Sequence, residues 1–199
     1  MATVPDPAVL LDHRGNLRPT LPAMLGYEDS RLSMAFHEAG HAVLAMSYGF
    51  HVRSSEVVAW EPGPGRWELT GLTTVVTEQV VPPWRFAAQA AAGTVAEVHY
   101  LMASGLWTPE RAAACDADHD RQHAIDIAAE TGHRIACDHV PAGGKSWGQV
   151  RGMALRKVGH LWREIRTVAH AMNEHTKLTG EQIAAMTGLI NAPVPGAVA

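Results

Sequence analysis

The pattern of hydrophobic positions predicts a mainly helical chain. Apolar residues recur at spacings of three and four from Met153 to Met172, as in an amphipathic helix that packs on a bundle. Pro82-Pro83 opens another helix at its first turn, and we expect this helix to continue to Ser104-Gly105. The capping box Thr179-Gly180-Glu181-Gln182 predicts a final short helix that ends near Ile190.

A further predicted helix carries a carboxylate on its apolar side. It is expected from about Asp118 to Thr131 and is closed by Gly132. The helical period points Asp120 inward, whereas it points the neighbouring polar residues elsewhere, namely Asp116, Asp118 and His119. A buried aspartate needs a cation or several hydrogen bonds. The alternative is a core aspartate that caps a neighbouring helix.

The most apolar predicted helix carries a cluster of polar side chains. It begins near Ser30 to Ser33, ends at Gly49, and is apolar nearly all round, which is typical of a buried helix. His37 and His41 are four residues apart, so both imidazoles lie on one face, with Glu38 one position round. A buried cluster of this kind must be paired or metal-bound.

The order His-Glu-x-x-His is the arrangement of zinc hydrolases. His37 and His41 can hold one Zn²⁺, and Glu38 can act as general base on a water at the metal. Zinc held by two histidines lacks a third protein ligand, and Asp120 fits that vacancy. A chain of this composition shows the motif by chance on the order of one time in twenty or thirty, so the alternative is a solvated helix with three polar residues.

The segments Val52–Trp60 and Trp67–Thr77 are rich in Val, Thr and Trp and predict a β-hairpin or small sheet beside the zinc helix. Gly71, Leu72 and Thr73 are our candidates for an edge strand on which an extended peptide adds over the metal. The alternative is a hairpin that only covers the core.

Glu97 lies on the buried face of the helix that starts at Pro82-Pro83. A ligating histidine usually donates its other N–H to a carboxylate, a carbonyl or a water, so Glu97 is a candidate partner for one of the two imidazoles. The alternative is a partly exposed glutamate near the helix end.

Composition narrows the class of protein. The chain has 199 residues, 47% of them hydrophobic, which suits a single domain (29–191). The N-terminal residues (1–28) are rich in Pro and polar residues and predict an irregular arm, with a disordered tail as the alternative. Pro193 and Pro195 predict a loose C-terminal tail (192–199). A net charge of -4 gives no electrostatic case for nucleic acid or an anionic membrane. Without a signal peptide or an apolar run of about 18 residues, we expect a soluble, cytoplasmic protein. Cys115 and Cys137 form no C-x-x-C pair, so two plain thiols are the simpler interpretation and a disulfide is the alternative.

Four blocks in sequence order resemble the peptidase domain of FtsH-type, ATP-dependent zinc proteases. His37–Val43 is similar to the zinc helix of that family, and Ala92–Glu97 to its Gly-x-x-Ala-Glu helix. Asp118–Ala124 is similar to the segment that supplies the third ligand, and Leu178–Ile183 to the closing Leu-x-Gly-Glu-Glu-Ile turn. The resemblance spans roughly Arg31–Leu189.

The resemblance implies a mostly helical domain with a small β element. It also implies zinc ligands at His37, His41 and Asp120. Glu38 would then be the general base, and Glu97 would hydrogen-bond to a ligating histidine. It implies a zinc-dependent endopeptidase that acts on flexible or unfolded polypeptides. Family members are usually fused to an ATPase ring and a membrane anchor, and this sequence shows neither, so a separate ATPase or self-association is an expected partner. Two alternatives stay open: a non-catalytic peptide-binding or regulatory module that retains a zinc site, and another zinc hydrolase with Glu97 as third ligand.

Overall fold

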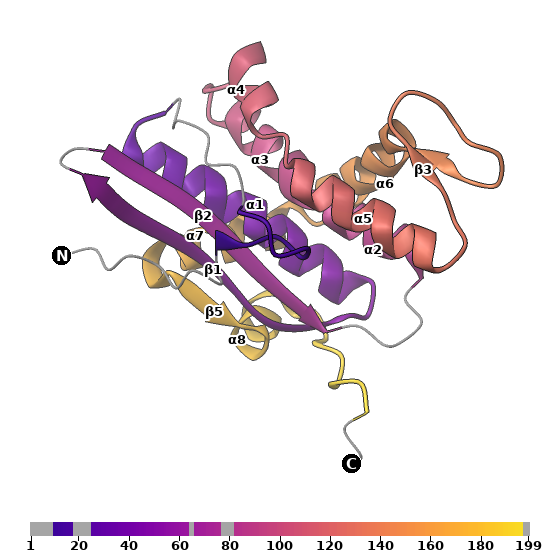
Figure 1. Cartoon of the computed structure of the whole chain (residues 1–199). Coiled ribbons are helices and arrows are strands. Elements are labelled where there is room, and N and C mark those ends of the chain that lie inside the picture. The colour runs from indigo at the N-terminus through magenta and orange to yellow at the C-terminus, as the bar shows by residue number, and fades with distance from the viewer. Residues whose placement is uncertain (1–9, 18–24, 64–65, 77–81, 197–199) are drawn as a thin grey trace.

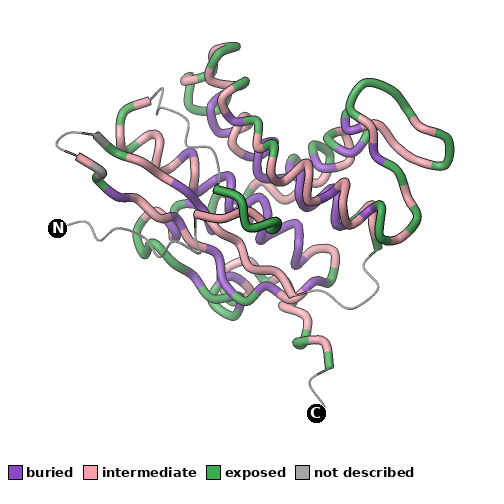
Figure 2. The backbone as a smooth tube through the Cα atoms, in the orientation of Figure 1, coloured by how far each residue is buried: buried purple, intermediate pink, exposed green. Residues whose placement is uncertain are grey.

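A long buried helix, α1 (Tyr27–Ser47), lies at the centre of the computed structural model, which describes residues 10–17, 25–63, 66–76 and 82–196 (Figure 1). Almost every residue from Ser33 to Met46 is buried, because a sheet and two other helices pack around α1 (Figure 2). The helix begins earlier than predicted, with Gly26 at its N-cap, so Ser30 and Ser33 lie inside the helix and neither caps it. The side chain of Ser33 bonds to Glu97.

Strands β1 (His51–Gly63) and β2 (Arg66–Val76) form the predicted antiparallel hairpin, while Thr77 lies outside the described residues. A short strand, β5 (Lys177–Thr179), pairs antiparallel with the other edge of β1. Among the residues that the structure describes, the order β2-β1-β5 places β2 at one edge of this sheet. One face of the sheet packs on α1, so the predicted β element does lie beside the helix with the two histidines.

The remaining elements follow in chain order. They are α2 (Pro83–Ala90), α3 (Ala92–Ala103), α4 (Pro109–Ala114), α5 (Asp118–Glu130), β3 (Ile135–Ala136), β4 (Lys145–Ser146), α6 (Trp147–His160), α7 (Trp162–His175) and α8 (Gly180–Thr187). The short strands β3 and β4 pair in parallel. The fold class is mainly α with a small antiparallel sheet, as predicted from the sequence.

Two helices that the sequence predicts as continuous are each broken. The first breaks at Ala91, between α2 and α3, and the second at Leu161, between α6 and α7. Apolar residues on both sides of each break pack into the same core, so the hydrophobic period continues although the helix axis does not. The capping box at Thr179 is present, but α8 ends at Thr187, where Gly188 adopts a left-handed conformation that stops the helix before Ile190.

Close contact between α1 and α3 positions the candidate site. Gly40 faces α3, and a Cβ at this position would lie 2.6 Å from the carbonyl oxygen of Ala92. Only a residue without a side chain lets the two backbones approach so closely. Phe36 stacks on Tyr100 with ring centroids 4.6 Å apart, which fixes the same pair of helices further along.

Several other expectations can be compared with the structure. Cys115 is a buried free thiol and Cys137 an exposed one, so no disulfide joins them. Tyr27 and Glu28, placed in the irregular arm, belong to α1, and residues 192–196 of the tail lie outside helices and strands. No helix in the part of the chain that the structure describes has the length and apolar character needed to cross a bilayer.

Candidate metal centre

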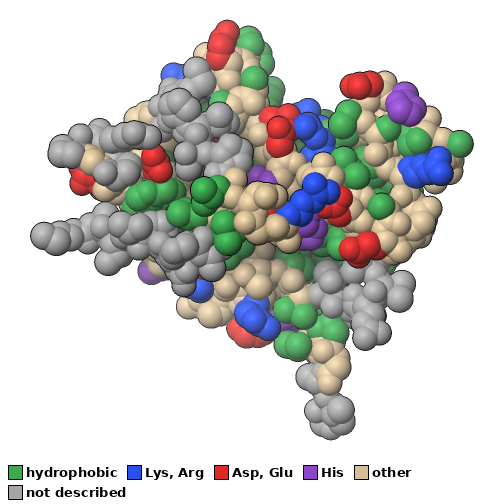
Figure 3. Space-filling model, in the orientation of Figure 1, with side chains coloured by type: hydrophobic (Ala, Val, Ile, Leu, Met, Phe, Trp, Pro, Cys, Tyr) green, Lys and Arg blue, Asp and Glu red, His purple; other side chains and the backbone are tan. Residues whose placement is uncertain are grey.

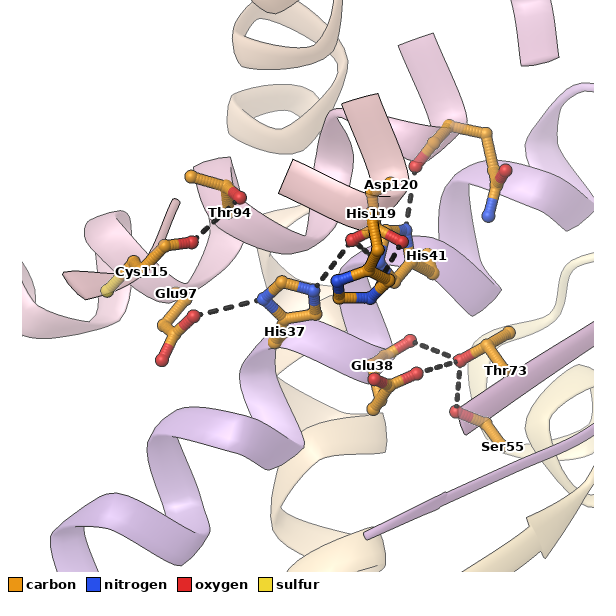
Figure 4. Close-up of polar contacts among 11 residues, drawn as sticks. His37, Glu38, His41, Ser55, Thr73, Thr94, Glu97, Cys115, His119 and Asp120 are labelled. Atoms are coloured by element: carbon orange, nitrogen blue, oxygen red, sulfur yellow. Dashed lines mark hydrogen bonds and ion pairs between the residues drawn. The ribbon is translucent and has the colours of Figure 1, made fainter. Parts of the chain in front are cut away.

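Three side chains from two helices meet in a cluster that can bind a metal ion. His37 and His41 come from α1, and Asp120 comes from the first turn of α5 (Figure 4). Oδ2 of Asp120 lies 3.2 Å from Nε2 of His37 and 3.1 Å from Nε2 of His41. The three ligand atoms all lie within 4.8 Å of one another. The structure thus brings together the three residues that the sequence selects as ligands.

The outer nitrogen of each imidazole has its own acceptor. Nδ1 of His37 donates to Oε2 of Glu97 at 3.0 Å, on the side of the ring opposite to Asp120 (Figure 4). Nδ1 of His41 donates to the carbonyl oxygen of Gln89 at 2.9 Å. Glu97 is itself held by the hydroxyl of Ser33 at 2.9 Å. With both Nδ1 protons directed outward, both Nε2 atoms face the centre of the cluster as a metal requires.

Electrostatics favour positive charge at the centre. Burial opposes charge on His37, yet hydrogen bonds to Asp120 and Glu97 raise its pKa well above the usual value. Burial also opposes charge on His41, whose pKa is raised by the nearby carboxylate of Asp120. Burial would raise the pKa of Asp120, but the charge of His41 and the hydrogen bonds from both imidazoles lower it well below the usual value. A divalent cation satisfies the same electrostatic preference.

Gly93 of α3 leaves the space that an ion needs. A Cβ at this position would lie 2.4 Å from Nε2 of His37 and 2.4 Å from Nε2 of His41. Imidazole nitrogens bind Zn²⁺ at about 2.0–2.1 Å, so the space without a side chain lies where both rings can reach an ion. Two neutral imidazoles and one carboxylate suit Zn²⁺ and other first-row divalent ions. The donor set and the space therefore fit a metal ion.

Glu38 lies next to the cluster without belonging to it. Its side chain is buried, and Oε2 accepts a hydrogen bond of 2.6 Å from the hydroxyl of Thr73 on β2. Thr73 in turn is bonded to Ser55 of β1 at 2.8 Å. A Cβ on Gly71 would lie 2.3 Å from Oε1 of Glu38, so the backbone of β2 touches this carboxylate. Gly71 and Thr73, two of the three candidate substrate-strand residues, thus lie against Glu38.

Two cavities open beside the cluster, and Glu38, Gly71 and His119 line both of them. The larger, of about 370 Å³, reaches His37 and Glu97 and has apolar walls that include Met34, Leu69 and Leu101. The smaller, of about 310 Å³, reaches the other two cluster residues and the edge strand from Leu72 to Val75, the third candidate strand residue included.

His119 lies at the site, although the helical period points it elsewhere. Its Nε2 atom is 3.3 Å from Oδ1 of Asp120. The side chain of His119 is long enough to bend along α5 toward Asp120. The helical period gives only the direction in which a residue leaves the helix, so it does not predict this contact. The acceptor carbonyl of Gln89 also has no sequence signal, because any residue supplies a backbone oxygen.

Comparison with known proteins assigns no family to the chain. No protein-family model matches it, and no curated protein matches it. Among the described residues, the one set of side chains grouped closely enough for a metal ion is His37, His41 and Asp120. Glu97 lies outside this set, which gives the alternative of Glu97 as third ligand no geometric support.

Proposed function

We propose that the chain is a zinc-dependent endopeptidase that hydrolyses peptide bonds in flexible or unfolded polypeptides. The observation that carries the proposal is a buried carboxylate, Glu38, that lies beside a metal-binding cluster, outside its ligand set, and on the wall of both cavities. The resemblance of four sequence blocks to the peptidase domain of FtsH-type zinc proteases supports the same function.

In this proposal His37, His41 and Asp120 hold the ion. Zinc, when bound, supplies a Lewis acid that polarises the peptide carbonyl and acidifies water. Glu38 removes a proton from the attacking water and passes it to the leaving amine. The hydroxyl of Thr73 holds one oxygen of Glu38 and so fixes the direction of the carboxylate. Glu38 is only 4% exposed, which limits its contact with bulk water.

The edge strand supports a polypeptide as substrate. Strand β2 has no further strand on its outer side among the described residues, and it lines the smaller cavity. An extended peptide can add to such an edge through main-chain hydrogen bonds, which would lay it beside Glu38. Flexible or unfolded chains offer such unpaired extended segments along their length, so we take them as the substrate class.

The test is Glu38→Gln, which keeps the shape of the side chain but removes the base. We expect zinc content to stay at wild-type level and cleavage of casein to fall by about 10²–10⁴-fold. Glu174→Gln, at an exposed position on α7, is the matched control and should cleave casein normally. Retained cleavage in Glu38→Gln would refute the role of the base. If the zinc-loaded wild-type protein binds peptides without cleaving them, the chain is a peptide-binding module instead.

A further inference from the structure

Residues 10–17, here called the strap, form a small self-supporting turn. Leu11 and Leu17 form an isolated antiparallel bridge. The carboxylate of Asp12 accepts hydrogen bonds of 2.8 Å from the backbone N–H groups of Arg14 and Asn16. These local hydrogen bonds give the turn a defined shape.

The strap is clamped onto α5 through a single carboxylate. Arg14 donates to Asp126 through Nε at 2.8 Å and Nη2 at 2.7 Å, one bond to each oxygen. His13 adds a bond of 2.8 Å to the same carboxylate and stacks on His123 with ring centroids 4.2 Å apart. A two-bond arginine–carboxylate pair fixes orientation as well as distance. Because Asp126 belongs to the helix that carries Asp120, the clamp fixes the strap relative to the metal centre.

The strap faces the edge of the sheet across a cavity. Leu11, Asp12 and His13 line the smaller cavity, which also reaches the cluster and the edge strand β2. In Figure 1 the strap crosses in front of β2, next to α5, and in Figure 3 basic, acidic and histidine side chains gather at the centre of this face. Space of about 310 Å³ remains between these walls, so the strap bounds the cavity without filling it.

We propose that the strap is the outer wall of the substrate groove, and that Arg14 and Asp126 are the positioning residues that set its affinity for an extended polypeptide. The proposal rests on the proposed function, because it assigns the occupant of the groove as the peptide substrate. One wall is the edge of β2 and the other is the strap. In this proposal the space of about 310 Å³ between the two walls takes the extended polypeptide.

The test is Arg14→Ala, with removal of residues 1–17 as a second variant. Both should raise KM for an unstructured fluorogenic decapeptide by about five- to tenfold with kcat little changed, because an ordered wall is lost. Exchanging the charges, Arg14→Asp with Asp126→Arg, should restore KM in part, because the ion pair returns but the bonds from His13 and Gln122 to the carboxylate of Asp126 are lost. Arg163→Ala breaks an exposed arginine–carboxylate pair on α7 and is the matched control, with KM expected at the wild-type value.

A binding measurement separates this proposal from the proposed function. The same decapeptide, labelled with fluorescein, is titrated into zinc-loaded Glu38→Gln protein with and without Arg14→Ala. Weaker binding in the double variant supports the wall even if the wild type cleaves nothing, in which case the peptidase proposal alone fails. Unchanged KM and unchanged binding after removal of residues 1–17 would overturn the wall. A lower KM in either strap variant would also overturn the wall, because the strap would then block the groove. Absence of both binding and cleavage in every variant would overturn both proposals.

Discussion

Replacing Gly93 by alanine should remove the metal and leave the fold intact. The new Cβ would lie 2.4 Å from Nε2 of both His37 and His41, whereas ordinary contact begins near 3.4 Å. Each ring must therefore retreat by about 1 Å, against a tolerance of about 0.2 Å for a metal–ligand distance. Replacing a residue that only hydrogen-bonds to a metal ligand typically costs about 10–100-fold in metal affinity. Direct displacement of two ligands should therefore cost at least about 100-fold.

The fold should survive because the clash is with the ends of side chains and not with backbone. The two imidazoles must turn, which disturbs their hydrogen bonds to Glu97 and the Gln89 carbonyl. Alanine is favoured over glycine inside a helix by about 1 kcal/mol, which offsets part of that loss. We therefore expect the metal-free Gly93→Ala protein to unfold at a temperature close to that of the metal-free wild type. This separates a failure to bind from a failure to fold.

The assay is a zinc titration against a chromophoric chelator, combined with thermal unfolding followed by circular dichroism. The matched control is Gly159→Ala on α6, where a Cβ meets nothing within 4 Å. The control should bind zinc like the wild type and unfold at the same or a higher temperature. Zinc affinity of Gly93→Ala within about threefold of the wild type would refute the placement of the ion between the two rings, since about 100-fold is expected.

Three other perturbations test the ligands, a titrating group and a helix cap. Asp120→Ala should lose stoichiometric zinc in metal analysis, whereas Glu97→Gln should only weaken affinity by about 10–100-fold, and loss confined to Glu97→Gln would overturn the assignment. Burial lowers the pKa of His123 to about 4, below its unfolded value, so the unfolded chain binds the extra proton and stability falls as pH drops from about 6.5 to 4. His123→Gln should therefore lose less thermal stability between pH 7 and 5 than the wild type. Thr179→Ala removes the cap of α8 and should lower the free energy of unfolding in urea by about 1 kcal/mol, with no change in zinc content.

The sequence could predict the cluster because each of its parts follows from a helical period. His37 and His41 are neighbours on any helix, and Asp120 and Glu97 stand out as carboxylates on apolar faces. Whether these side chains come together depends on how the helices pack, and the packing of α1 on α3 depends on a single glycine. Gly40 allows α3 to approach α1 closely, which places Glu97 on the outer nitrogen of His37.

The strap and the helix breaks have no comparable signal. His13 and Arg14 bind Asp126 across more than a hundred residues, and their pairing follows no period. The breaks at Ala91 and Leu161 keep the apolar pattern intact, because the residues on both sides still face one core. A hydrophobic pattern reports which side of an element is buried, but it does not report where the axis changes direction or which exposed charges pair.

The position of Glu38 and the shape of β2 depend on each other. Gly71 and Thr73 are two residues apart on the strand, so both face α1. At Gly71 the absence of a side chain admits the carboxylate, and at Thr73 a short hydroxyl bonds to it at 2.6 Å. A polypeptide paired with the edge of β2 would thus meet a carboxylate whose direction is set by the same strand. Ser55 of β1 bonds to Thr73 of β2, and Thr73 bonds to Glu38. In the proposed peptidase, β2 therefore aligns both the substrate and the general base.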